Sequence, residues 1–394
     1  MQTEHVTVSV PALRPEDKAY VDSLQRLALA IVLCGWAAAG ATDTDIWGHL
    51  AIGLDMLTEH RFLWVDPYSF THDQRWVNHE WLWDVVVGAL YRDLGLAGLI
   101  ALRISLIGTV LWTIDRATRR APSWMRAVTL VVVAVGCIGQ WQSTRPQIAT
   151  ITLYAVVLTN LGAAWLPALF MVWANTHGGW LIGLGAVVTH AVVDRSRRSL
   201  LVAAACIVAT LITPYGIHLW FALADAMRRG WADVSEWSPI WSAAAGSLMP
   251  WLGWAVLLAG GLVFLSRRVD ADRWSWGWTV LTFAAAIRSR RLVALATVTA
   301  AVLLLPRWSL PALQVPNAWN RNRQLIAVLV IVAAGAAGWS FIQPTLRCFP
   351  PISEAVAPEP DAVAFLRGTD VRRVFVYFDF GEYAIFHLRD RLQV

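Results

Sequence analysis

The segment LALAIVLCGWAAAGATDTDIWGHL, residues 27–50, passes from a long apolar run directly into a polar stretch. An apolar run of this length predicts a helix that spans a lipid bilayer, and we place that helix at 24–42. The polar stretch that follows contains Asp43, Asp45 and His49. The segment therefore predicts a transmembrane helix with titratable side chains at one face of the membrane.

The same alternation of apolar runs and short polar stretches continues along the chain. Of its 394 residues, 57% are hydrophobic and 15% are charged, whereas a soluble domain carries roughly 25% charged residues. We therefore predict an all-α integral membrane protein with about eleven transmembrane helices. They are expected at 24–42, 97–115, 124–140, 147–164, 166–176, 179–193, 199–213, 248–266, 274–288, 291–305 and 324–342.

Arginines in the polar stretches predict the orientation of the chain. If the N-terminus is cytoplasmic, four arginine-rich connections fall on the cytoplasmic side, as the positive-inside rule requires. These connections lie around residues 116–126, 195–198, 267–273 and 321–323. The formal net charge of +5 then reflects topology and contact with anionic lipids. No basic stripe typical of nucleic-acid-binding proteins occurs, which argues against nucleic acid as a partner.

Three regions follow from these spans. Residues 1–23 are expected to form a cytoplasmic tail without a cleavable signal, and residues 24–342 the transmembrane domain. Residues 343–394 are expected to form a small α/β segment on the outer side, with a helix at 361–367 and a strand at 374–378. We interpret this segment as truncated or minimal, because about fifty residues bury little surface for an independent domain.

The first outer connection, residues 43–96, is predicted to contain two amphipathic helices. Apolar residues recur at helical spacing from Ile46 to Leu57 and again from Trp81 to Leu94. Helices with one apolar face are expected to lie on the membrane surface. The two helices would then roof a cavity at the outer face.

Arginine also occurs on the outer side, where the positive-inside rule disfavours it. Arg145 lies in one outer connection, and Arg288, Arg290 and Arg291 lie in another. Binding of a phosphate group explains charges in such places, because a guanidinium group binds phosphate through two parallel hydrogen bonds. The alternatives are lipid headgroups, pairing with acids of the outer connections, or a topology shifted by one helix.

A series of short motifs occurs in the outer connections. They are Asp43–Leu50, Asp66–Thr71, Trp76–Leu82, Thr144–Gln147, Asn175–Gly179, Thr213–Gly216 and Phe378–Tyr383. In these motifs the chain resembles bacterial membrane proteins related to the GT-C superfamily of glycosyltransferases, which includes protein O-mannosyltransferases, aminoarabinose transferases and oligosaccharyltransferases. The resemblance implies transfer of a sugar, with inversion, from a polyprenyl-phosphate carrier to a lipid, glycan or protein acceptor. It also implies a location in the bacterial inner membrane with a periplasmic active face.

The resemblance assigns the general base to an acidic residue directly after the first helix, which here is Asp43 or Asp45. A carboxylate in this position would take the proton of the acceptor hydroxyl or amine. The alternative for Asp45 is that it caps the helix beginning at Ile46. The carrier phosphate is expected to bind to Arg145, Arg288, Arg290 and Arg291.

Further polar residues on the outer side are candidates for the substrate pocket. They are His49, His79, Glu80, Asn175, His177, Tyr215 and Glu236. Four side chains are also candidate ligands of Mn²⁺, Mg²⁺ or Zn²⁺, namely Asp45, His49, His79 and Glu80. The alternatives are a polar network that links the two amphipathic helices and, for Asn175, His177 and Tyr215, capping of helix ends.

Two other functions fit the composition. A transporter would place polar groups near the middle of the bilayer on broken helices, whereas this chain gathers them at one membrane face. A non-catalytic lipid- or glycan-binding component of an envelope assembly complex would use the arginines without depending on Asp43 or Asp45. We therefore favour the glycosyltransferase, with the other two as alternatives.

Overall fold

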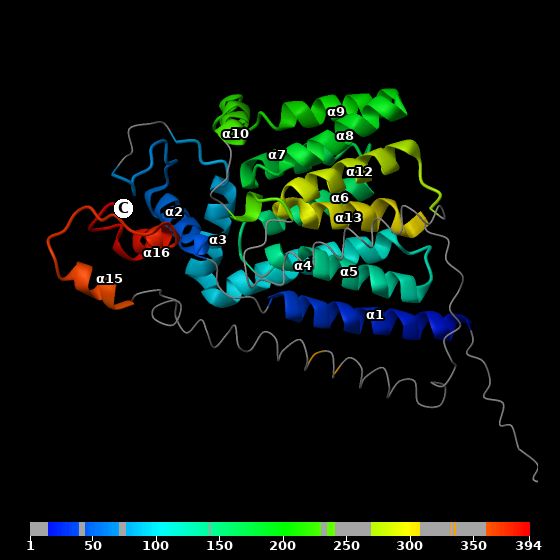
Figure 1. Cartoon of the computed structure of the whole chain (residues 1–394), viewed down its shortest axis with the longest axis horizontal. Helices are drawn as coiled ribbons and strands as arrows, with labels where there is room; N and C mark the ends of the chain where they lie inside the picture. Colours follow the sequence, from blue (N-terminus) through cyan, green and yellow to red (C-terminus); the bar gives the residue numbers. More distant parts are fainter. Residues whose placement is uncertain are drawn as a thin grey trace, which may run out of the picture.

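The computed structural model describes residues 15–38, 44–70, 76–141, 143–229, 235–240, 269–307, 332, 335 and 360–394. In these residues all regular structure is helical, with fourteen α-helices and three short 3-10 helices. Long helices run side by side as a bundle, and α2, α3 and α16 lie together at one end of it (Figure 1). The predicted all-α class is confirmed for the described residues.

Among the described residues, nine helices make up the bundle, and they coincide with nine of the eleven expected spans. The other two expected spans, 248–266 and 324–342, lie wholly or largely outside the described residues. The nine are α1 (Pro15–Ala38), α4 (Leu96–Ala117), α5 (Ser123–Trp141), α6 (Gln147–Thr159), α7 (Leu166–Thr176), α8 (Trp180–Asp194), α9 (Arg197–Ala209), α12 (Arg273–Arg288) and α13 (Val293–Leu303).

Three of the described helices are long and apolar enough to cross a membrane. They are Ala19–Ala38 within α1, Leu96–Ala117 and Ser123–Trp141, with 20, 22 and 19 residues. The other six bundle helices have from 11 to 16 residues. At 1.5 Å per residue these are shorter than a hydrocarbon core of about 30 Å. The described chain thus suggests a membrane protein, but it does not show about eleven full crossings.

The outside of the bundle is apolar, as expected of a surface in contact with lipid. Val192, Leu201 and Val208 are 60%, 59% and 61% exposed. Soluble proteins rarely present broad apolar surfaces to water, whereas lipid chains solvate them. Inside the bundle, the indoles of Trp141 and Trp173 are completely buried.

Polar groups inside the bundle bind one another. The Trp278 indole on α12 donates to the Tyr154 hydroxyl on α6 at 2.8 Å. That hydroxyl lies 2.7 Å from the Thr299 Oγ1 on α13, which in turn donates to the Leu295 carbonyl. Tyr154 is therefore the donor to Thr299. These hydrogen bonds join three helices and satisfy polar groups for which lipid chains offer no partners.

The two amphipathic helices of the first outer connection are confirmed as α2 (Asp45–Glu59) and α3 (Trp81–Leu94). They approach each other closely where Gly53 faces Gly88. A Cβ atom added to Gly53 would lie 1.9 Å from the Asp84 carbonyl oxygen, and one added to Gly88 would lie 2.8 Å from the Gly53 carbonyl carbon. Glycine is thus required at both positions, because a side chain at either one would collide with the backbone of the other helix.

Replacing Gly53 with alanine is expected to lower the stability of the folded protein by roughly 3 kcal/mol, because the added methyl group forces α2 and α3 apart. Thermal unfolding of the detergent-solubilised protein measures the effect. Gly277→Ala on α12 is the matched control, since no heavy atom of the described residues lies within 4 Å of its added Cβ. Equal melting temperatures for Gly53→Ala and Gly277→Ala would contradict the prediction, because α2 and α3 would then separate without loss of stability.

Two expectations about the chain ends need correction. Helix α1 begins at Pro15 rather than after residue 23, because proline fits the first turn of a helix. The expected strand at 374–378 is wrong: the chain there makes a single bridge, Arg373 to Gln393, and helix α16 (Phe378–Leu388) already begins at Phe378. The expected helix at 361–367 is confirmed as α15 (Pro360–Arg367).

Candidate functional site

A chain of ion pairs joins four outer segments at the bundle end that carries α2. Arg145, just before α6, lies with Nη2 3.0 Å from the Asp45 Oδ2 at the start of α2. Its Nη1 donates to the Glu236 Oε1 at 2.6 Å. The second Glu236 oxygen lies 3.6 Å from the Arg291 Nη1, and the Arg291 guanidinium stacks over the Trp237 ring at 5.1 Å. Acids and arginines therefore alternate along one rim.

This arrangement locates the predicted base and phosphate ligands. Asp45 is the first residue of α2, and Thr44 holds the N-cap position of this helix. The helix thus begins one residue earlier than the capping alternative for Asp45 assumes. Asp43 lies outside the described residues.

The remaining outer arginines differ from Arg145 and Arg291. Arg290 belongs to the short 3-10 helix Arg290–Leu292, and its guanidinium lies 3.3 Å from the Ser238 hydroxyl. Its backbone N–H also donates to the Ser238 carbonyl, which attaches this turn to the 3-10 helix Ser235–Trp237. Arg288 is exposed at the end of α12. Arg290 thus positions the segment that carries Glu236, and Arg288 has the character of a surface cation.

A buried ion pair connects α2 to α3. His49 Nδ1 lies 2.6 Å from Asp84 Oδ1, and the Asp84 carboxylate is almost fully buried. The second Asp84 oxygen accepts a hydrogen bond from the Asn78 amide at 2.6 Å. Burial alone would lower the pKa of His49, but the bond to Asp84 raises it to about 9. The alternative of a polar network linking the two helices is confirmed for His49, with Asp84 as a partner that the sequence did not suggest.

The protonated His49 is expected to stabilise the fold in a pH-dependent manner. Because its pKa rises from 6.5 to about 9 on folding, the contribution is complete below pH 6.5 and is lost as the pH rises through 9. The wild type should therefore lose melting temperature between pH 6.5 and 9.5 more steeply than His49→Gln. His218→Gln, at an exposed position, should behave like the wild type; parallel profiles for all three proteins would contradict the assignment.

Glu80, directly before α3, faces two histidines. Its Oε1 lies 3.5 Å from His79 Nε2 and 3.6 Å from His177 Nε2. Burial raises the pKa of Glu80, but the surrounding histidines and Arg291 outweigh it and hold that pKa below its usual value. Glu80 is therefore an ionised carboxylate that lies beside His79 and His177.

His177 is held in one tautomer by its neighbours. The Gly179 N–H donates to the Nδ1 of His177 at 3.0 Å, and Thr150 Oγ1 lies 2.7 Å from the same atom. Because Nδ1 accepts, the proton of the neutral ring lies on Nε2, toward Glu80. Burial lowers the pKa of His177 to about 3. This side chain is therefore a neutral donor at physiological pH.

Asn175 and Tyr215 each connect segments that are distant in the sequence. The Asn175 amide donates to the carbonyls of Met171 and Ile212 at 2.7 and 2.9 Å. Its oxygen accepts from the Trp81 indole at 2.8 Å, which ties α7 to α3. The buried Tyr215 ring packs edge-on against Trp64 at 5.3 Å. Asn175 thus uses both of its donors within the fold.

Glu382 is a site residue that sequence reasoning missed. It lies on α16, and its Oε2 accepts a hydrogen bond from the Gly48 N–H at 3.2 Å. Burial, followed by the charge of Asp45, raises the pKa of Glu382 to about 8. The motif Phe378–Tyr383 contains Glu382, but the sequence assigns no role to this residue. The structure therefore adds a second carboxyl group, protonated near neutral pH, beside Asp45.

Residues of α16 are fixed to α2 by aromatic contacts. The Trp47 ring packs against Tyr383 and Phe386, with centroids 5.3 and 5.0 Å apart. A Cβ added to Gly48 would lie 2.6 Å from the Glu382 Oε2. Glycine at this position lets the carboxyl group reach the α2 backbone.

The four candidate metal ligands are divided among different partners. Asp45 contacts Arg145, His49 contacts Asp84, and His79 contacts Glu80. Within the described ranges, no three His, Cys, Asp or Glu side chains are arranged as ligands of one metal ion.

Comparison with known proteins identifies no relative for this chain. No protein-family model matches it, and no curated protein matches it significantly. The functional assignment therefore depends on the geometry of the site and on the motifs of the sequence.

Proposed function

We propose that the protein is a membrane glycosyltransferase that moves a sugar from a polyprenyl-phosphate carrier to an acceptor at the rim defined by Asp45, Arg145, Glu236 and Arg291. The observation that carries this proposal is the ion-pair chain, in which a carboxylate lies next to arginines at the end of an apolar bundle. Transfer from a lipid phosphate needs these elements: a base for the acceptor and cations for the leaving group.

In the proposed step, an acceptor hydroxyl or amine attacks the anomeric carbon of the sugar. Its proton passes to the carboxylate of Asp45 or of Asp43. The bond between the anomeric carbon and the phosphate oxygen breaks, and the electron pair stays on the polyprenyl phosphate. Attack opposite the leaving group inverts the anomeric centre, as in the GT-C enzymes that the motifs resemble.

Glu236 is the residue that the carrier would displace. In the free protein its two carboxylate oxygens face Arg145 and Arg291, at 2.6 and 3.6 Å. A phosphate group offers the same two guanidinium groups oxygen acceptors with a larger charge. Exchange of Glu236 for phosphate would leave Arg145 between the leaving group and Asp45.

The proposed placement is the bacterial inner membrane, with a GT-C-like arrangement of about eleven crossing helices. The N-terminus would be cytoplasmic and the site periplasmic. Support comes from the distribution of arginine, because the connections around 116–126 and 195–198 lie at the bundle end opposite to α2 (Figure 1).

The test is a transfer assay in liposomes that contain the purified protein. A panel of polyprenyl-phosphate sugars is supplied with a membrane extract as acceptor, and mass spectrometry follows donor consumption and product, with and without a chelator. Consumption of one donor with formation of polyprenyl phosphate is expected. Binding without consumption would instead favour the envelope-complex component, and movement of intact donor across the bilayer would favour a transporter. Loss of turnover with the chelator would add a divalent metal to the step.

A further inference from the structure

A groove with a volume of about 770 Å³ runs along α1, α4 and α5, from Ser23 to Gly35 of α1, and Gly335 also lines it. Its body is apolar and is formed by Leu27, Ile31, Cys34, Ile104, Gly108 and Trp112. Leu27 and Trp112 are 52% and 63% exposed, so the groove opens on the surface that faces lipid. The groove is therefore accessible from the bilayer.

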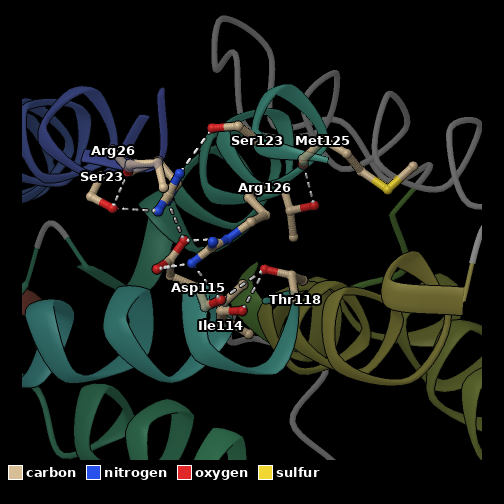
Figure 2. Close-up of polar contacts among 10 residues, drawn as sticks. Ser23, Arg26, Ile114, Asp115, Thr118, Ser123, Met125 and Arg126 are labelled. Carbon is tan, nitrogen blue, oxygen red and sulfur yellow. Dashed lines mark hydrogen bonds and ion pairs between the residues drawn. The ribbon is translucent and has the colours of Figure 1, made fainter. Parts of the chain in front are cut away.

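The end of the groove is polar and strongly cationic. Arg26 on α1 and Arg126 on α5 both contact the carboxylate of Asp115 on α4 (Figure 2). Arg26 Nε lies 3.1 Å and Arg126 Nε 2.9 Å from the same oxygen, Asp115 Oδ1. Arg26 also donates to the Ser123 hydroxyl at 2.9 Å. Two guanidinium groups thus share one carboxylate.

The charges around this end do not balance. The side chains of Arg26 and Arg126 are only 12% and 15% exposed, so water screens them poorly. Asp22 also attracts Arg26, but three exposed arginines occupy the same rim, namely Arg116, Arg119 and Arg120. Among the side chains that the structure describes, positive charge therefore exceeds negative charge where the apolar groove ends.

We propose that this groove binds an anionic phospholipid, with its phosphate at Arg26 and Arg126 and an acyl chain along Leu27 and Trp112. A soluble phosphate would match the arginines but not the apolar body, whereas a zwitterionic lipid would match the body but bring a second cation to a cationic end. The proposal depends on the membrane location of the bundle and not on glycosyl transfer.

Lipid retention tests the proposal. The full chain is purified in detergent, mixed with equal amounts of phosphatidylglycerol and phosphatidylcholine, and examined by native mass spectrometry. The wild type should retain phosphatidylglycerol preferentially, and Arg26→Gln/Arg126→Gln should retain about tenfold less. Arg197→Gln/Arg273→Gln removes the same charge from exposed positions of the same rim and should retain the lipid as the wild type does.

Two further variants separate lipid binding from a purely structural ion pair. Asp115→Asn releases both arginines and should increase retention of phosphatidylglycerol severalfold, whereas a structural clamp would only lose stability. Gly108→Phe should fill the groove, since among the described residues only the Cys34 sulfur lies near its added Cβ, at 4.0 Å. Gly277→Phe serves as its control. Equal retention of the two lipids by the wild type, or unchanged retention in the double arginine variant and in Gly108→Phe, would overturn the proposal.

Discussion

Replacing Asp45 with asparagine is expected to reduce the rate of sugar transfer by about 10²–10⁴-fold, the usual contribution of a general base. Asparagine keeps the shape of the side chain but cannot accept the proton of the acceptor. In the wild type, burial followed by the charge of Asp45 raises the pKa of the nearby Glu382 to about 8, so this carboxyl group is mostly protonated at neutral pH. The rate is measured as donor consumption per protein in liposomes, at saturating donor.

Two variants complete this test. Asp93→Asn removes an acid from the exposed end of α3, where Asp93 pairs with Arg92 at 2.8 Å, and should leave the rate unchanged. Asp43→Asn shows which of the two acids after the first helix is the base. A rate within about twofold of the wild type for both Asp43→Asn and Asp45→Asn would exclude base catalysis by either residue.

Replacing Arg145 with glutamine is expected to weaken binding of the polyprenyl-phosphate carrier by about 10–100-fold, the range for a charged hydrogen bond to phosphate. Glu236→Gln should act in the opposite direction, because it removes the carboxylate that competes with phosphate for Arg145 and Arg291. Binding is measured by titrating polyprenyl phosphate into the detergent-solubilised protein.

Arg288→Gln is the matched control for this prediction. It removes the same charge from an exposed position at the same bundle end, so binding should change by less than about threefold. The melting temperature of each variant is recorded in parallel. Equal weakening by Arg145→Gln and Arg288→Gln would mean that only the general positive charge of the rim attracts the carrier.

The parts of the fold that the sequence predicted depend on local periodicity. Apolar spacing placed α2 and α3 because a helix buries one face at a fixed repeat. The positive-inside rule predicted only that Asp45, Arg145 and Glu236 share one membrane face; their direct contacts are seen in the structure. The first inference uses residues close together in the sequence. The second uses only the fact that successive connections alternate between the two membrane faces.

The parts that could not be predicted depend on contacts distant in sequence. Gly48 and Glu382 are 334 positions apart, and no local pattern relates them. The expected strand at 374–378 reflected β-branched and aromatic residues, but such propensity depends on a neighbouring strand, and none exists in the described chain. Apolar spacing in α3 likewise gives no reason to bury Asp84, whose carboxylate lies in the interior beside His49.

The most direct test of the central claim is donor consumption by the wild type and by the double variant Asp45→Asn/Arg145→Gln in the same liposomes. The double variant removes both charges of the Asp45–Arg145 ion pair, so neither residue is left as a charge without the other. If the two residues act as base and phosphate ligand, the wild type consumes donor and the double variant is at least about 100-fold slower. Equal consumption by the two proteins would contradict the account and reduce the Asp45–Arg145 contact to a structural ion pair.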